Sequence, residues 1–227
     1  MSASTVWLFD LDNTLHDASY AAFGGINERM TGYIVEHLGL PQPEADALRK
    51  RYFLRYGATL LGLVRHHGVK GEHFLHHTHV LPGLEGRVRG FSHDFAALAA
   101  LPGRKYVLTN APADYTARVM GTLGVQHLFD GVLAIEDMRM FGHWRPKPDT
   151  RMLRAIAARL KVPPHRCVLV EDTVGHLRGA KAVGMGTVWM QRFTRSASWG
   201  IAMSTRVSAR PAHVDRRVTR LAQLLRR

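Results

Sequence analysis

The 227-residue sequence predicts an α/β protein: a Rossmann-like parallel sheet core with a helical segment inserted after the first strand. Two observations lead to this prediction. Short apolar runs, typical of buried strands, alternate with amphipathic helical patterns over most of the chain. One long stretch near the N-terminus breaks the alternation, because it contains helical patterns and no strand pattern.

The predicted strands are short and rich in valine, leucine and aromatic residues, and they cover residues 6–10, 106–109, 132–135, 168–170 and 187–190. Between them, apolar residues recur at helical spacing, which predicts helices over residues 113–123, 149–160 and 174–183. Repetition of strand, helix and strand favours a mostly parallel sheet with helices on both faces.

The stretch that breaks the alternation has four helical patterns, over residues 22–37, 43–56, 59–67 and 72–79. Turns rich in glycine and proline lie among them. The sequence therefore predicts two domains, an α/β core of residues 1–17 and 82–227 and an inserted helical domain of residues 18–81.

The C-terminal segment is basic, because residues 192–227 contain nine arginines and one acid, Asp215. Residues 194–211 have the composition of a loop. After it, basic and apolar residues interleave, which predicts an amphipathic terminal helix with a solvated basic face. The residues of this expected helix are Arg216, Arg217, Val218, Arg220, Leu221, Leu224, Leu225, Arg226 and Arg227.

Composition narrows the class of protein. The chain is 46% hydrophobic, as expected for a globular protein with a core, and its net charge of +13 would suit an acidic partner or a phosphorylated substrate. The single cysteine, Cys167, excludes an internal disulfide framework and fits a reducing compartment. No signal peptide pattern or long apolar span is present. We therefore expect a cytoplasmic monomer or homodimer with no membrane partner.

Polar side chains follow three of the predicted strands. Asp10 ends the first, Thr109 and Asn110 end the second, and Glu171 and Asp172 end the fourth. Because ligands of parallel α/β sheets bind in the crevice at the carboxyl ends of the strands, these side chains are expected to meet in one site.

A second aspartate, Asp12, lies close to Asp10 in sequence. Two neighbouring carboxylates require either a retained proton or a cation between them, and Asp172 offers a third carboxylate. Oxygen ligands of this kind suit Mg²⁺. Lys147, between two prolines, would add a fixed positive charge.

Four short motifs, in this order, resemble those of the haloacid dehalogenase (HAD) superfamily: FDLDNTL at residues 9–15, LTNA at 108–111, KPD at 147–149 and VEDT at 170–173. The resemblance spans about residues 6–190. It implies the HAD fold, with residues 18–81 as a C1 cap that closes over the site, and a phosphomonoester hydrolase that works through an aspartyl-phosphate.

The resemblance also implies a role for each motif residue. Asp10 would be the nucleophile and Asp12 the acid/base. Thr109 and Lys147 would hold the phosphoryl oxygens. The implied Mg²⁺ ligands are Asp10, the backbone carbonyl of Asp12, Asp172 and, directly or through water, Glu171.

Shorter motifs, RYGATL at residues 55–60, HVLP at 79–82 and TNA at 109–111, resemble the pyrimidine 5′-nucleotidase branch of this superfamily. They imply a nucleoside 5′-monophosphate substrate such as UMP or CMP. Candidate substrate-binding residues are Asn110, Tyr56, Thr59 and Arg65, which offer an aromatic face, hydroxyls and a cation. Two alternative functions stay open: a phosphatase that acts on a sugar phosphate or phosphoglycolate, and a phosphomutase.

Other functions fit less well. Dehalogenation uses neither a second aspartate nor Mg²⁺, whereas Asp12 and Asp172 are present. A zinc site among His73, His76, His77 and His79 is disfavoured relative to a solvated helix face. A basic nucleic-acid-binding protein on a HAD fold is the alternative from another class, and a solvated basic face explains the arginines more simply, so a nucleic acid partner is not expected.

Overall fold

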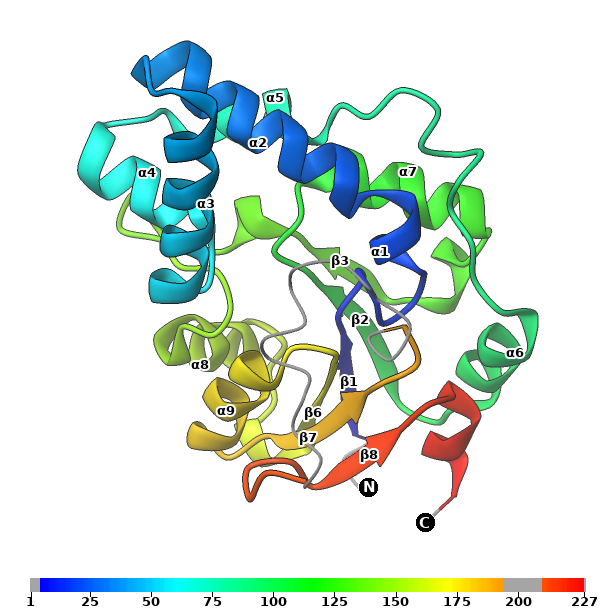
Figure 1. The fold of residues 1–227 in the computed structure, drawn as a ribbon. Helices are drawn as coiled ribbons and strands as arrows, with labels where there is room; N and C mark the ends of the chain where they lie inside the picture. The colour runs from blue at the N-terminus through cyan, green and yellow to red at the C-terminus, as the bar shows by residue number, and fades with distance from the viewer. Residues whose placement is uncertain (1–4, 194–209, 227) are drawn as a thin grey trace. The chain divides into compact units, whose positions relative to one another are not determined.

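The computed structural model describes residues 5–193 and 210–226 (Figure 1). The chain forms two compact units, one of Met1–Ser19 and Val88–Arg227 and one of Tyr20–Arg87. We call them the core unit and the helical unit. Residues 82–87, assigned to the core from sequence, belong to the helical unit, where Arg87 Nε donates a hydrogen bond to the carbonyl of Ala21 over 3.0 Å.

The core unit is built on a six-stranded sheet in the order β3-β2-β1-β6-β7-β8, in which all neighbouring strands are parallel (Figure 1). The predicted Rossmann-like parallel α/β fold is therefore confirmed. The strands are β1 (Val6–Phe9), β2 (Arg104–Leu108), β3 (Gly131–Leu133), β6 (Cys167–Glu171), β7 (Gly186–Met190) and β8 (Arg216–Val218). Strand β1 lies between β2 and β6, at the centre of the sheet.

The helices of the core unit are α6 (Ser92–Ala100), α7 (Ala113–Leu123), α8 (Thr150–Arg159) and α9 (Val174–Ala182). In Figure 1, α8 and α9 lie on one side of the sheet and α6 on the other. Val6 and Leu8 of β1 are fully buried in one cluster with Leu153 of α8 and Leu177 of α9. Burial of each such leucine contributes about 1.5–3 kcal/mol, so this layer fixes the strand that leads into the site.

A short antiparallel hairpin, β4 (Arg139–Met140) and β5 (His143–Trp144), precedes the segment that carries Lys147. Its strands are too short to produce an alternating pattern of apolar and polar residues, so the hairpin was not predicted. The side chain of Arg139 lies over the ring of Trp144, with the guanidinium carbon 4.6 Å from the ring centre.

The prediction of a C-terminal amphipathic helix is wrong. Residues Arg216–Val218 form β8, which pairs in parallel with β7, and Leu221–Leu225 form one short 3-10 helix. Without β8, the backbone N–H and C=O groups along one edge of β7 would lack hydrogen-bond partners. Pairing with β8 provides partners, and just after β7 the Gln191 N–H donates to the carbonyl oxygen of Val218 over 2.9 Å. Most of the predicted loop at residues 194–211 lies outside the described residues.

The helical unit contains α2 (Phe23–Leu38), α3 (Gln42–Tyr56), α4 (Thr59–His67) and α5 (Gly71–His79), and α1 (Ala18–Ala21) leads into it. Helices α3 and α4 pack closely because Gly62 lies against the Tyr52 ring, where a Cβ atom would overlap that ring. No helix within residues 5–193 and 210–226 combines the length and apolar character needed to cross a bilayer.

Candidate active site

The loop after β1 has the geometry needed to present two aspartates. Asp10 continues the pairing with β6, because its N–H donates to Val170 O over 2.9 Å. Asn13 then adopts a left-handed conformation with φ of 56°, which asparagine tolerates better than most residues. Its side-chain oxygen accepts from Ser19 N over 3.0 Å and its amide donates to Ser19 Oγ over 2.9 Å. Asn13 therefore fixes the turn that places Asp12 just beyond the strand.

Three carboxylates meet at the carboxyl ends of β1 and β6. Asp10, Glu171 and Asp172 each offer an oxygen, and these oxygens lie within 4.8 Å of one another. Lys147 reaches the same point: its Nζ donates to Asp10 Oδ1 over 2.6 Å and to Glu171 Oε2 over 2.7 Å. The Lys147 side chain is only 1% exposed. The buried ammonium of Lys147 thus joins Asp10, which is 137 positions away in sequence, to Glu171, which is 24 positions away.

Burial and mutual repulsion set the protonation of this cluster. Burial, and then the charge of Glu171, raise the pKa of Asp10 to about 8. The same two causes raise the pKa of Asp172 well above its ordinary value. Burial opposes ionisation of Glu171, but Lys147 and then His176 outweigh it and hold its pKa well below the usual range. Burial likewise opposes the charge of Lys147, yet Asp10 and Glu171 keep its pKa above the ordinary value. One lysine does not neutralise three acids.

The segment carrying Lys147 is held from two sides. The Asn110 side chain accepts from Lys147 N over 2.9 Å and donates to Lys147 O over 3.1 Å. On the other side, Gly179 of α9 lies so close to Pro148 that a Cβ atom there would be 2.5 Å from the Pro148 carbonyl oxygen. Asn110, a predicted substrate-binding residue, thus has a contact that orders Lys147, and its contact with a substrate stays a prediction.

Thr109 and Glu171 are buried at the strand ends, as their positions in the sequence indicated. Thr109 Oγ1 accepts from Ala111 N over 3.0 Å. Both oxygens of Glu171 have protein partners, because Oε1 accepts from Thr173 N over 3.1 Å and Oε2 accepts from Lys147. Asp10 and Asp172 are therefore better placed than Glu171 to give oxygens to a cation.

The carboxylate of Asp12 is held by two side chains that sequence reasoning missed. His16 Nε2 lies 2.8 Å from Asp12 Oδ1, and the Tyr115 hydroxyl donates to the same oxygen over 2.8 Å. His16 is fully buried and Tyr115 is 1% exposed. No described residue bonds the other oxygen, Oδ2. His16 follows Asp12 by four residues, a weak signal, whereas Tyr115 is 103 residues away and gives none.

The remaining predicted substrate-binding residues lie in the helical unit. Tyr56 is partly buried, and its hydroxyl lies 2.6 Å from His66 Nε2. Arg65 is exposed on α4. Thr59 is buried, and its hydroxyl donates to Arg49 O over 3.1 Å, which is a packing contact within the unit. Contact of these residues with a substrate stays a prediction.

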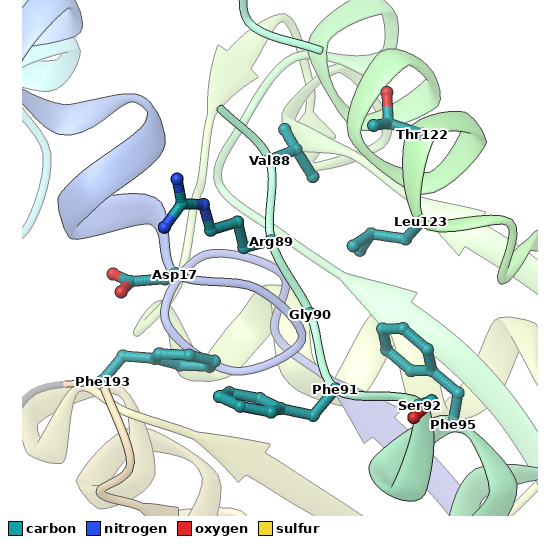
Figure 2. A pocket seen from close by; sticks show the side chains of 10 residues that line it. All are labelled: Asp17, Val88, Arg89, Gly90, Phe91, Ser92, Phe95, Thr122, Leu123 and Phe193. Carbon is teal, nitrogen blue, oxygen red and sulfur yellow. The ribbon is translucent and has the colours of Figure 1, made fainter. Parts of the chain in front are cut away.

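A cavity of about 740 Å³ in the core unit does not contain the acidic cluster (Figure 2). Its walls come from Asp17 and from the segment after residue 87, together with α7 and Phe193. Asp17 N donates to Arg89 O over 3.1 Å, so a backbone hydrogen bond joins two of the segments that line the cavity. Its lining combines aromatic side chains, among them Phe91 and Phe95, with the charged residues Asp17 and Arg89, and it includes no residue of the acidic cluster.

The donor set of the acidic cluster fits a hard divalent cation. The buried carboxylates of Asp10 and Glu171 and the partly buried carboxylate of Asp172 have oxygens close together, and the pKa values of Asp10 and Asp172 are raised. A bound Mg²⁺ would relieve the repulsion that these features reflect. Among the residues that the structure describes, no other group of three or more acids, histidines or cysteines brings its ligand atoms as close together. A nucleophilic carboxylate, a fixed cation and an oriented second carboxylate in one place are suited to group transfer through Asp10.

Comparison with known proteins gives matches along most of the chain. It is 23% identical over 198 residues to Phosphate metabolism protein 8 of Saccharomyces cerevisiae, covering 82% of this chain and 61% of that protein. It is 34% identical over 80 residues to Fructose-1-phosphate phosphatase YqaB of Escherichia coli, covering 35% of this chain and 40% of that protein. The chain thus spans less than two thirds of the curated relatives it matches.

A putative haloacid dehalogenase-like hydrolase from Bacteroides fragilis has the same fold, with a TM-score of 0.64 and 22% identity, covering 97% of this chain and 99% of that one. The model of the haloacid dehalogenase-like hydrolase family matches residues 5–184, which include all four motifs. The chain therefore belongs to the haloacid dehalogenase-like hydrolase family.

Proposed function

We propose that this chain is a Mg²⁺-dependent phosphomonoester hydrolase that works through an aspartyl-phosphate on Asp10. The observation that carries the proposal is the buried cluster of Asp10, Lys147 and Glu171, with Asp172 beside it. A carboxylate nucleophile repels an anionic phosphate ester, so it needs positive charge at the point of attack. Among the residues of the cluster, Lys147 supplies this positive charge.

The proposed reaction has two displacements at phosphorus. A carboxylate oxygen of Asp10 forms a bond to phosphorus while the ester P–O bond breaks, and the leaving oxygen takes a proton from Asp12. A water molecule then gives a proton back to Asp12 and attacks phosphorus, which releases inorganic phosphate and the Asp10 carboxylate. Thr109 and Lys147 bind the phosphoryl oxygens in both steps.

Mg²⁺ would be held by Asp10, the backbone carbonyl of Asp12 and Asp172, with Glu171 supporting the site through Lys147. When bound, it would supply positive charge to the phosphoryl oxygens and reduce the repulsion between the carboxylates. The residues of the chain then have distinct tasks: Asp10 attacks, Lys147 orients, and Asp12 moves the proton.

Mg²⁺ affinity is expected to fall as the pH is lowered from 8 to 6. Burial, followed by Glu171, raises the pKa of Asp10 to about 8, so below that pH the metal must displace a proton from this carboxyl. Release of one proton per ion corresponds to about a tenfold loss of affinity per pH unit. Isothermal titration of the protein with Mg²⁺ at pH 6, 7 and 8 measures this, and an affinity constant across that range would contradict it.

Loss of the Tyr115 hydroxyl is expected to slow hydrolysis through Asp12. Two donors on Oδ1 orient this carboxyl so that Oδ2 faces the leaving oxygen, and general acid catalysis contributes about 10²–10⁴-fold. We expect Tyr115→Phe to lower kcat/KM, which reports formation of the aspartyl-phosphate, about tenfold or more for an alkyl phosphate and much less for p-nitrophenyl phosphate, whose leaving group needs no proton. Equal losses on both substrates would show that Tyr115 has only a structural role.

A nucleoside 5′-monophosphate such as UMP or CMP is the substrate we propose. The support comes from the motifs at residues 55–60, 79–82 and 109–111 and from the aromatic character of the helical unit near Tyr56. Its ring lies beneath Arg55, whose guanidinium carbon is 5.4 Å from the ring centre, and such a surface suits a base. We further propose that the helical unit acts as a C1 cap over the core unit.

A sugar phosphate is the second candidate substrate. It is favoured by the similarity to Fructose-1-phosphate phosphatase YqaB, which is 34% identical over 80 residues. A phosphotransferase or phosphomutase would use the same aspartyl-phosphate and differ only in the acceptor.

A phosphate-release screen of nucleotides, sugar phosphates and phosphoglycolate, with Mg²⁺ and with EDTA, tests the proposal. We expect release only with Mg²⁺ and highest kcat/KM for pyrimidine nucleotides. A preference for fructose 1-phosphate or phosphoglycolate would reject the nucleotide and keep the phosphatase. Absence of release from every ester, with Asp10 unmodified, would reject the phosphatase itself. A cytoplasmic location stays a prediction.

A further inference from the structure

Three histidines from two helices form an aromatic cluster on the helical unit. His37 lies near the end of α2, and His73 and His77 are four residues apart on α5. The ring centres are 5.3 Å apart for His37 and His73, 6.0 Å for His37 and His77, and 6.3 Å for His73 and His77. All three rings gather around Tyr33, whose ring stacks on His37 with centres 3.9 Å apart.

We propose that His37, His73 and His77 bind a divalent transition-metal ion such as Zn²⁺, with water in the fourth position. Zn–N bonds are about 2.0–2.1 Å long, so three imidazoles on one tetrahedral ion have ring centres roughly 5–6 Å apart. The observed spacings are close to this value. A histidine pair four residues apart on one helix is a common basis for such a site, and His37 supplies the third ligand from the neighbouring helix.

Hydrogen bonds prepare two of the rings for metal binding. His37 Nδ1 lies 3.1 Å from the carbonyl oxygen of Tyr33 and must donate to it, which leaves the Nε2 lone pair open. His73 Nδ1 lies 2.9 Å from the Tyr33 hydroxyl, and in the tautomer in which Nδ1 donates to this hydroxyl the Nε2 lone pair of His73 is open as well. Metal-binding histidines usually hold the other ring nitrogen in this way, because the hydrogen bond fixes the tautomer. Within the described residues, no group bonds either Nε2 atom.

The site differs in chemistry from the acidic cluster of the core unit. Imidazole ligands suit Zn²⁺, Ni²⁺ and Cu²⁺, whereas carboxylates suit Mg²⁺. Binding requires the rings to rotate, because the three nitrogens do not yet lie as close together as the oxygens of Asp10, Glu171 and Asp172 do. His73 and His37 are exposed, and His77 is partly so, which leaves room for this rotation. His37 was missed among the candidate zinc ligands because it lies on another helix, 36 positions before His73 in sequence.

Zinc titration of the full chain without an affinity tag, in excess Mg²⁺ to occupy the acidic cluster, tests the proposal. Isothermal titration is expected to show one Zn²⁺ site in the wild type that His77→Ala weakens by more than tenfold. His76→Ala is the matched control, because His76 is an exposed histidine on the same helix, outside the cluster. It is expected to leave the affinity unchanged.

Tyr33→Phe provides a second test that keeps all three histidines. It removes the hydroxyl that holds His73 Nδ1, and loss of such a partner typically costs 10–100-fold in metal affinity. Melting temperatures without metal show whether each variant is folded. The proposal is overturned if the wild type binds no Zn²⁺ under these conditions, or if His76→Ala weakens binding as much as His77→Ala does. Neither result depends on phosphatase activity.

Discussion

Lys147→Met is expected to lower the free energy of unfolding of the metal-free protein by about 3–5 kcal/mol at pH 7. Lys147 is buried between Asp10 and Glu171, at 2.6 Å and 2.7 Å, and its loss leaves buried carboxylates with no counter-charge from this side chain. Urea unfolding with EDTA present measures the effect. Lys181→Met is the matched control, because Lys181 also lies 2.6 Å from a carboxylate, that of Asp215, but is 42% exposed.

The control should cost less than about 1 kcal/mol, since water screens exposed ion pairs. Equal costs for the two variants would contradict the role we give to burial. The effect of Lys147→Met also depends on pH. Lys147, against the effect of burial, holds the pKa of Glu171 below its ordinary value of 4.5, so the stability it provides is present above that pH and is lost as the pH falls. The gap between Lys147→Met and the wild type should therefore be smaller at about pH 3.5 than at pH 7.

Asp10→Asn is expected to abolish phosphate-ester hydrolysis, with a loss of at least about 10⁴-fold in kcat, because removal of a nucleophile leaves only binding and electrostatic effects. The variant should nevertheless be no less stable than the wild type in EDTA at pH 8. Burial and Glu171 raise the pKa of Asp10 from 3.8 to about 8, so its ionisation costs stability as the pH rises through that range. Asparagine does not ionise.

The stability difference in favour of Asp10→Asn should therefore be largest near pH 8 and shrink toward pH 4. Thermal melts across this range, in EDTA, measure it alongside the activity assay. A variant that retained a substantial fraction of wild-type activity would remove Asp10 from the reaction. A variant that lost activity because it had unfolded would show this in the same melts.

Local patterns in the sequence were sufficient to predict the centre of the fold. The apolar run before Asp10 gives β1, and each of its neighbours in the sheet is also a short apolar run followed by polar residues. Because parallel strands bring their carboxyl ends to one edge, the proximity of Asp10 and Asp172 could be predicted from the sequence alone. The KPD motif also predicted that Lys147 belongs to the site.

Contacts that depend on packing could not be predicted. The burial of Lys147 depends on Asn110 and Gly179, which hold its segment from different elements. The Tyr115 contact with Asp12 joins positions 103 residues apart. The C-terminal error has a similar cause: the spacing of Val218, Leu221 and Leu224 also fits a helix, and only the open edge of β7 favours a strand.

Trapping of the phosphorylated protein tests the central claim most directly. Asp12→Asn protein, given p-nitrophenyl phosphate labelled at phosphorus and quenched in acid, should retain the label, because the first displacement needs no acid with this leaving group and the second lacks its base. We predict one labelled site, on the peptide containing Asp10 and sensitive to hydroxylamine, and none in Asp10→Asn. Label on any other residue, or hydrolysis by the wild type with no labelled protein in Asp12→Asn, would contradict the account.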